Sequence, residues 1–300
     1  MEMFYASDVP AQVRTLLEEA LTAATNEWGN YGPLEYWVAG TNVTAATDLA
    51  DQFCTRRISR GQGWYPNKET CLTNEHVATF LPAQAVNAAA DIEAGRPSSN
   101  AGLNGMRDWD IHLFSSSYPF GFAGLLGVPF ADDQKTAFHE YFHAVQHAHI
   151  FTRDRDERDE MLGPMWFIEG GAEFMAQTTS QRLRDSGALT ASTWDSFTER
   201  MEWKMNSVKD RIAANPGVKI SNIGYGPDQS IGYDYGTWAH AYLADIAGQD
   251  ALLDSFYANL NDLGWEASFA NTYGMSSTTF LAVFDEFVDL PIAEQLLILP

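Results

Sequence analysis

The chain has 300 residues, of which 45% are hydrophobic, enough for one large domain or two small ones with a sizeable core. Its formal net charge of −22 repels phosphate groups, so we expect neither nucleic acid nor an anionic lipid surface as a partner. No stretch reaches the roughly 18 apolar residues of a membrane-spanning helix, and we expect no membrane span.

The first 130 residues mix helical and strand patterns. Asp8 and Pro10 are typical of a helix start, and apolar residues follow them at helical spacing as far as Ala24. Aromatic and aliphatic residues at 34–39 favour a strand, and the alternation at 109–115 favours a second strand at a sheet edge. Further helices are predicted at 45–57 and 75–94, with a loop at 96–100.

After Pro129 the pattern is almost wholly helical. Asp132 or Asp133 can cap a helix that reaches about His149. We therefore expect an α+β protein with a mixed α/β amino-terminal subdomain at 1–130 and a helical subdomain at 131–300, which form one catalytic unit with a cleft at their junction. In the second part we predict a solvated loop at 152–160, helices at 165–184 and 193–214, a loop at 217–232, and helices from 236 to the end.

Two cysteines, Cys54 and Cys71, flank a turn-rich segment. A disulfide between them would suit an exported protein, whereas two buried thiols are the alternative. The start of the chain lacks the basic and apolar regions of a signal peptide. We expect a mature secreted or periplasmic form, and a cytosolic location stays open.

The most informative motif is His139-Glu140-Tyr141-Phe142-His143, an HExxH sequence. Two histidines four residues apart on a helix lie on one face, one turn apart, which suits two ligands of a tetrahedral zinc ion. The glutamate beside the first histidine can act as a base on metal-activated water.

Two residues compete for the third ligand position. Glu169 follows after enough residues for a loop and a returning helix, and Glu173 lies one turn later in the same apolar segment. His149 fits the last position of HExxHxxGxxH, the metzincin pattern, but Gln146 replaces the glycine that bends the helix. Without that bend His149 is about 240° round the helix from His143, so the geometry favours Glu169. His147 is an assisting candidate.

The HExxH motif and the segment at 166–174 resemble the gluzincin metallopeptidases, the MA-like clan of thermolysin and the zinc aminopeptidases. The resemblance implies a thermolysin-like zincin domain with one Zn²⁺, held by His139, His143 and Glu169, and with Glu140 as the general base. It also implies an edge strand beside the active-site helix. Thermolysin-like members carry an aspartate where this chain has Glu173, which would accept a hydrogen bond from a ligand imidazole.

The segment Tyr233-Asp234-Tyr235-Gly236 is similar to the Tyr-x-x-Gly of the aminopeptidase branch, whose tyrosine stabilises the oxyanion. This assigns that role to Tyr233, with Tyr235 and Tyr225 as fallbacks and His240 as a more distant one. The amine-binding Gly-x-Met-Glu-Asn segment of that branch is missing from the sequence. Endopeptidase activity is therefore the better expectation.

The sequence thus predicts a zinc-dependent endopeptidase that acts on a peptide or protein substrate, with the strand near 111–115 pairing with the extended substrate. One alternative is a zinc esterase or amidase with a non-peptide substrate, because activated water does not by itself distinguish acyl groups. Another is a zinc-stabilised binding module without catalysis, although Glu140 would then serve no purpose. Oligomeric state and substrate preference are not readable from the sequence.

Overall fold

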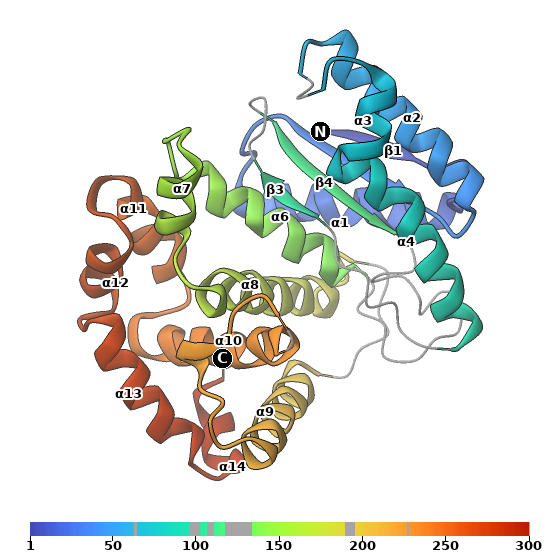
Figure 1. Ribbon diagram of the computed structural model, residues 1–300. Coiled ribbons are helices and arrows are strands. Elements are labelled where there is room, and N and C mark those ends of the chain that lie inside the picture. The colour runs from blue at the N-terminus through green and yellow to red at the C-terminus, as the bar shows by residue number, and fades with distance from the viewer. Residues whose placement is uncertain are drawn as a thin grey trace. The chain divides into compact units, whose positions relative to one another are not determined.

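In the amino-terminal half, three short strands pair in parallel to form a sheet (Figure 1). The computed structural model describes residues 1–62, 65–95, 103–106, 111–117, 134–189, 196–226 and 228–299. Strands β1 (Glu2–Tyr5), β2 (Leu34–Ala39) and β4 (His112–Ser117) run parallel, and β3 (Leu103–Met106) is antiparallel to β4. The spatial order is β1-β2-β4-β3.

This order corrects the prediction of an edge strand at 109–115. The strand found there, β4, lies between β2 and β3 and pairs with both. Its backbone groups are therefore already used inside the sheet, and the edge position belongs to β3. The prediction that this strand pairs with an extended substrate is therefore wrong, because β4 already pairs with a strand on each side. The strand β1 was not predicted, since four residues give too little alternation to read.

Helices cover both faces of this sheet, and β2 is accordingly buried along its whole length. Alternate residues of β2 point to opposite faces. On one face Trp37 packs edge-on against Phe53 of α2 (Val43–Ser59), with ring centroids 5.1 Å apart. On the other face Tyr36 contacts Phe114 of β4 at 5.7 Å and lies close enough to Glu140 of α6 (Lys135–Ala148) for its pKa to be affected by that carboxylate.

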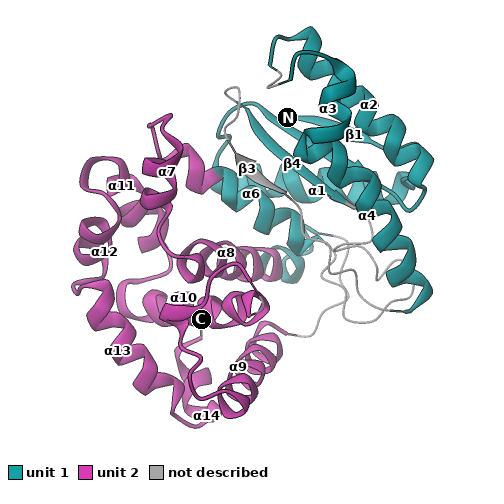
Figure 2. Cartoon of the chain, viewed as in Figure 1, with its two compact units in different colours: residues 1–144, 182–194 teal, residues 145–181, 195–300 magenta. Residues whose placement is uncertain are grey.

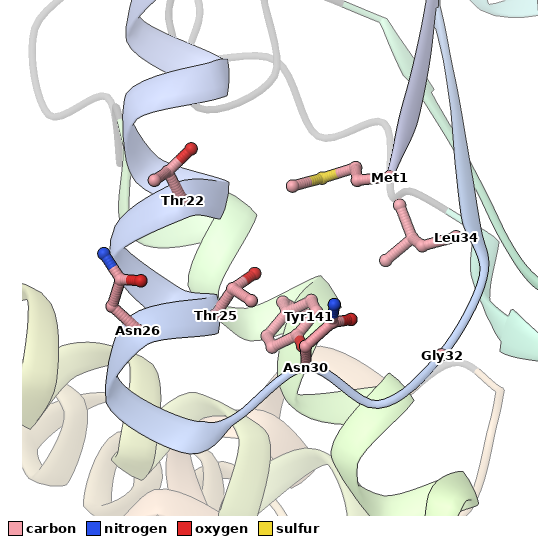
Figure 3. Close-up of a pocket in the computed structure, with 8 residues that line it drawn as sticks. All are labelled: Met1, Thr22, Thr25, Asn26, Asn30, Gly32, Leu34 and Tyr141. Carbon is pink, nitrogen blue, oxygen red and sulfur yellow. The ribbon is translucent and has the colours of Figure 1, made fainter.

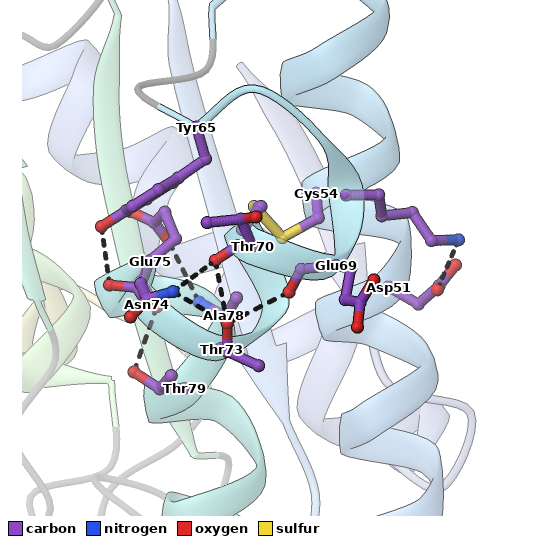
Figure 4. Close-up of a disulfide and its surroundings, with 12 residues drawn as sticks. Asp51, Cys54, Tyr65, Glu69, Thr70, Thr73, Asn74, Glu75, Ala78 and Thr79 are labelled. Carbon is purple, nitrogen blue, oxygen red and sulfur yellow. Dashed lines mark hydrogen bonds and ion pairs between the residues drawn. A yellow bond between two sulfur atoms is a disulfide. The ribbon is translucent and has the colours of Figure 1, made fainter.

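The predicted disulfide is confirmed. Cys54 of α2 and Cys71 of α3 (Lys68–Asn74) are bonded and almost fully buried (Figure 4). A cross-link that closes a loop of this length contributes about 3 kcal/mol by restricting the unfolded chain. The remaining helices of this half are α1 (Ala11–Trp28) and α4 (His76–Glu93), which agree with the predicted helices.

The second half is helical, as predicted. Its longest helix, α8 (Met165–Asp185), supplies Trp166 and Phe167 to a cluster of stacked and edge-on aromatic rings, in which Phe167 lies 4.6 Å from Phe256 and Trp166 lies 5.7 Å from Phe280. The other elements are α7 (Arg155–Leu162), α9 (Phe197–Ala214), η3 (Ile220–Asn222), α10 (Gln229–Ala247), the π-helix η4 (Leu252–Tyr257), α11 (Ala258–Leu263), α12 (Trp265–Tyr273), α13 (Ser277–Val288), α14 (Ile292–Gln295) and η5 (Leu296–Ile298).

Two predicted loops were partly wrong. The charged run at 152–160 contains most of α7, whose amino terminus is capped by Asp154 and favoured by acidic residues in its first turn. Helix α10 begins at Gln229, within the predicted loop at 217–232 and ahead of the predicted helix start at Gly236. Local charge and glycine content misled both assignments. The predicted cap at Asp132 or Asp133 and the predicted loop at 96–100 lie outside the described residues.

The chain divides into two compact units, Met1–Ala144 with Arg182–Trp194 and Val145–Gln181 with Asp195–Pro300 (Figure 2). Two of the three boundaries fall inside continuous helices, one in α6 and one in α8. The predicted division at residue 130 and its cleft stay predictions. A mainly helical chain with one small sheet agrees with the α+β class, and within the described part no helix has the length and apolar character needed to cross a membrane.

Candidate metal centre

Helix α6 carries the HExxH motif and packs against the end of α1 and the residue that follows it. Phe138 and Phe142 pack edge-on against Trp28 at the end of α1, with ring centroids 5.7 and 5.0 Å away. The Tyr141 hydroxyl donates a hydrogen bond to the carbonyl oxygen of Gly29 at 2.5 Å. At about 100° per residue, Tyr141 lies on roughly the opposite side of the helix from both histidines. These contacts set the rotation of α6.

The two histidines of the motif face each other. Their Nε2 atoms are 3.2 Å apart, and the side chains of His139 and His143 are 7% and 2% exposed. Two nitrogen ligands of a tetrahedral zinc ion, each about 2.0–2.1 Å from the metal, lie about 3.3 Å from each other. The spacing of the imidazoles therefore matches the spacing that such an ion requires.

Glu169 of α8 is the third member of this group. One ligand atom from each of His139, His143 and Glu169 lies within 4.8 Å of the other two, and all three residues are buried. Two imidazole nitrogens and one carboxylate oxygen form a donor set that zinc accepts in hydrolases. This group, which we call the HHE cluster, can hold a metal ion.

His149, the competing third ligand, has a different environment. Its Nδ1 atom lies 2.8 Å from the backbone oxygen of Val145, and its ring packs at 5.6 Å against Tyr257. Helix α6 continues through Gln146 as far as Ala148. His147 is buried on the same helix and does not belong to the HHE cluster.

Glu169 is held by a tyrosine. The Tyr225 hydroxyl donates a 2.6 Å hydrogen bond to its Oε1 atom. Tyr225 is 62% exposed although Glu169 is only 3% exposed, so this phenol connects a buried carboxylate to the molecular surface. Tyr225 was predicted only as a fallback for the oxyanion role, and the structure brings its hydroxyl to a candidate ligand.

Glu140, the predicted base, is 5% exposed. Its carboxylate lies close enough to Tyr36 of β2 to affect the pKa of that hydroxyl. Burial raises the pKa of Tyr36, and the negative charge of Glu140 raises it further. The hydroxyl of Ser116 donates to the Tyr36 oxygen at 3.0 Å. Tyr36 thus stays a neutral phenol beside the predicted base.

Glu173 belongs to a buried ionic group one turn after Glu169. The ammonium of Lys204 lies 3.1 Å from Glu173 Oε1 and donates to Asp234 Oδ1 at 2.8 Å, and Gln177 donates to Glu173 Oε1 at 2.9 Å. Lys204 is only 2% exposed. The predicted hydrogen bond from a ligand imidazole to Glu173 stays a prediction. Nothing in the local sequence distinguishes Lys204, one of two lysines in the charged helix α9, as a buried residue.

The Tyr-x-x-Gly segment lies within α10 rather than at its start. Its glycine has a packing role: a Cβ on Gly236 would lie 2.3 Å from the backbone oxygen of Trp166, and one on Gly170 would lie 2.3 Å from the Gly236 carbonyl carbon. The two glycines therefore allow the backbones of α8 and α10 to approach closely. Tyr233 is half-buried, and its predicted oxyanion role stays untested.

The two remaining fallbacks are core residues. Tyr235 packs against Phe284 at 5.7 Å, and burial raises the pKa of its hydroxyl. His240 is buried, with Nε2 placed 3.0 Å from the Phe167 oxygen, to which it donates. Burial lowers the pKa of His240 to about 3, so the imidazole is neutral at physiological pH.

A small cavity of about 190 Å³ lies between α1, the start of β2 and Tyr141 (Figure 3). Tyr141 faces away from the ligand histidines, so this cavity is not formed by the metal-binding face of α6.

Comparisons with known proteins found no relative of this chain. No protein-family model matches the sequence, no curated protein matches it, and no solved structure matches it. Its chemistry is therefore inferred from its own residues.

Proposed function

We propose that this protein is a zinc-dependent hydrolase, and most specifically a metalloendopeptidase of the gluzincin type. The observation that carries the proposal is the HHE cluster, two imidazoles and one carboxylate within 4.8 Å of one another, with Glu140 directly after the first histidine. A purely structural zinc site usually has four protein ligands and needs no base. Three ligands with an adjacent glutamate are typical of a hydrolase.

Zinc bound by His139, His143 and Glu169 would lower the pKa of a water molecule toward about 7 and polarise the substrate carbonyl. Glu140 would accept a proton of that water as the water oxygen bonds to the carbonyl carbon, and would donate the proton to the leaving nitrogen as the C–N bond breaks. Its burial keeps the carboxylate away from bulk solvent, and the neutral Tyr36 beside it adds no second negative charge.

Two tyrosines are candidates for the hydrogen bond to the developing oxyanion. Tyr233 has the support of the motif resemblance, and Tyr225 has the support of position, since its hydroxyl lies 2.6 Å from Glu169. Because Tyr225 is largely exposed, a bound substrate has access to its ring. The buried disulfide supports a secreted or periplasmic location.

The decisive variant is Glu140→Gln, with the exposed Glu93→Gln on α4 as its matched control. Both proteins are loaded with zinc, analysed for metal content and assayed on a peptide library. We expect Glu140→Gln to keep its zinc and to lose at least about 10²–10⁴ in turnover, while Glu93→Gln behaves as wild type.

Near-normal turnover by Glu140→Gln would refute the assigned base. Parallel assays with small esters separate a peptidase from an esterase or amidase. If the wild type binds zinc but hydrolyses neither class, the protein is a zinc-stabilised binding module.

A further inference from the structure

A buried glutamine connects the two helices that carry the HHE cluster. Gln146 lies on α6, three residues after His143, and is fully buried. Its Nε2 atom donates a hydrogen bond of 2.9 Å to the backbone oxygen of Ile168. Ile168 directly precedes Glu169 on α8. The Gln146 side chain therefore connects the helical turn after His143 to the peptide group that precedes Glu169.

The bridge is compatible with an intact helix. A backbone carbonyl has two lone pairs, so the Ile168 oxygen can accept from Gln146 while it also accepts the helical hydrogen bond. Burying the amide of a glutamine in an apolar interior without hydrogen-bond partners is costly. The hydrogen bond to Ile168 removes part of that cost, so the contact favours the arrangement in which it forms. Gln146 thus defines both the distance between α6 and α8 and their relative register at this point.

The glutamine also contacts Tyr257. The side chains of Tyr257 and Gln146 are hydrogen-bonded to each other, and Tyr257 is almost fully buried. Tyr257 ends the π-helix η4, a rare local conformation that recurs at functional sites. The ring of Tyr257 also packs against His149 at 5.6 Å. The amide of Gln146 is therefore fixed by two different elements, α8 and η4.

We propose that Gln146 is a positioning residue of the metal centre. It holds α6 and α8 at the spacing at which His143 and Glu169 reach one ion, and Tyr257 fixes its amide for that purpose. The inference rests on the proposed zinc site and adds to it a residue that binds no metal itself. Side chains that orient metal ligands typically change metal affinity 10- to 100-fold when they are removed.

The chain offers a matched control for this residue. Gln295 of α14 is also fully buried, and its Nε2 atom donates to the backbone oxygens of Phe287 and Val288 at 2.9 and 3.0 Å. Gln146→Met and Gln295→Met each remove a hydrogen bond from a buried glutamine to a backbone oxygen. Methionine has a similar length, so the space is still filled. A second variant, Tyr257→Phe, frees the amide of Gln146 without changing the glutamine.

The experiment measures zinc affinity of the full-length variants by competition with a chelating dye, and the stability of the metal-free proteins by urea unfolding. We expect Gln146→Met to weaken zinc binding about 10- to 100-fold and Tyr257→Phe to weaken it by less. Gln295→Met should bind zinc as the wild type does, although it too loses stability.

Wild-type affinity in folded Gln146→Met, or equal weakening in Gln295→Met, would overturn the positioning role and leave the zinc site intact. If Gln146→Met does not fold, unchanged zinc affinity in Tyr257→Phe would overturn it. Absence of zinc binding in the wild type would overturn the proposed function and this inference together.

Discussion

Two buried glutamates of similar exposure have very different surroundings. Glu35 on β2 is 2% exposed, and Arg57 Nη2 donates to both of its carboxylate oxygens, at 2.7 and 2.5 Å. Glu169 on α8 is 3% exposed; it accepts a hydrogen bond from the Tyr225 hydroxyl and belongs to a group with two imidazoles. Arginine is always charged, whereas a phenol and an imidazole at neutral pH are largely neutral.

The difference indicates separate roles. Burial alone would raise the pKa of Glu35, but hydrogen bonds from Arg57 and Arg56 hold it below its ordinary value. The positive charge that pairs with the Glu35 carboxylate is the Arg57 side chain of the same protein, which is typical of a structural ion pair. The neighbours of Glu169 are instead groups that bind a divalent cation in hydrolases. We therefore expect Glu35 to act on folding alone and Glu169 to act through metal.

The largest effect should come from breaking the structural pair. Arg57→Met leaves Glu35 buried without its main partner and should lower the free energy of unfolding by about 3–5 kcal/mol. Urea unfolding of the metal-free protein measures this loss. The double variant Arg57→Met with Glu35→Met should regain most of the stability, because an apolar pair needs no charge compensation. A single variant as stable as wild type would show that Arg56 alone suffices.

A smaller effect is expected at the metal ligand. With free zinc at about 100 times its dissociation constant, the wild type should gain about 2.7 kcal/mol of unfolding free energy. Glu169→Gln should lose most of this gain while the metal-free protein stays within about 1 kcal/mol of wild type. Glu35→Gln should show the reverse pattern, with lower metal-free stability and an undiminished gain from zinc. Equal zinc-linked gains in Glu169→Gln and wild type would break the comparison.

A third buried group, His240, should give the smallest effect, which is a change in how the free energy of unfolding depends on pH. Its folded pKa of about 3 lies below the ordinary 6.5, so the stability it contributes is complete above about pH 6.5 and is lost as pH falls toward 3. Between pH 7 and pH 5 the loss is about 2 kcal/mol. Unfolding free energies of wild type and His240→Gln at both pH values isolate this term, since the acidic surface is common to both. The same pH dependence of the unfolding free energy in wild type and His240→Gln would contradict this contribution of His240.

The sequence predicted the parts that depend on local spacing. His139, Glu140 and His143 follow from helical periodicity, and Cys54 and Cys71 from their separation across a turn-rich segment. The position of Glu169 was inferred from its motif and its apolar surroundings, and its approach to the histidines required tertiary structure. Most helices were found, since their apolar patterns extend over several turns.

Other features depend on long-range pairing that a sequence does not display. Lys204 resembles a surface lysine until its two carboxylate partners are known. The position of β4 inside the sheet depends on β3, which has only four residues. The contact of Gln146 with Ile168 spans two helices, and nothing in either segment alone predicts it. The resemblance to the Tyr-x-x-Gly segment assigned the oxyanion role to Tyr233, whereas the tyrosine that donates a hydrogen bond to Glu169 is Tyr225.

The central claim is that His139, His143 and Glu169 share one divalent ion. Crystals grown with zinc, measured with X-rays at the zinc absorption edge, test it most directly. We expect one anomalous peak about 2.0–2.1 Å from a nitrogen of each histidine and about 2.0–2.2 Å from a carboxylate oxygen of Glu169. No peak at this position, or a single peak bound by other residues, would contradict it.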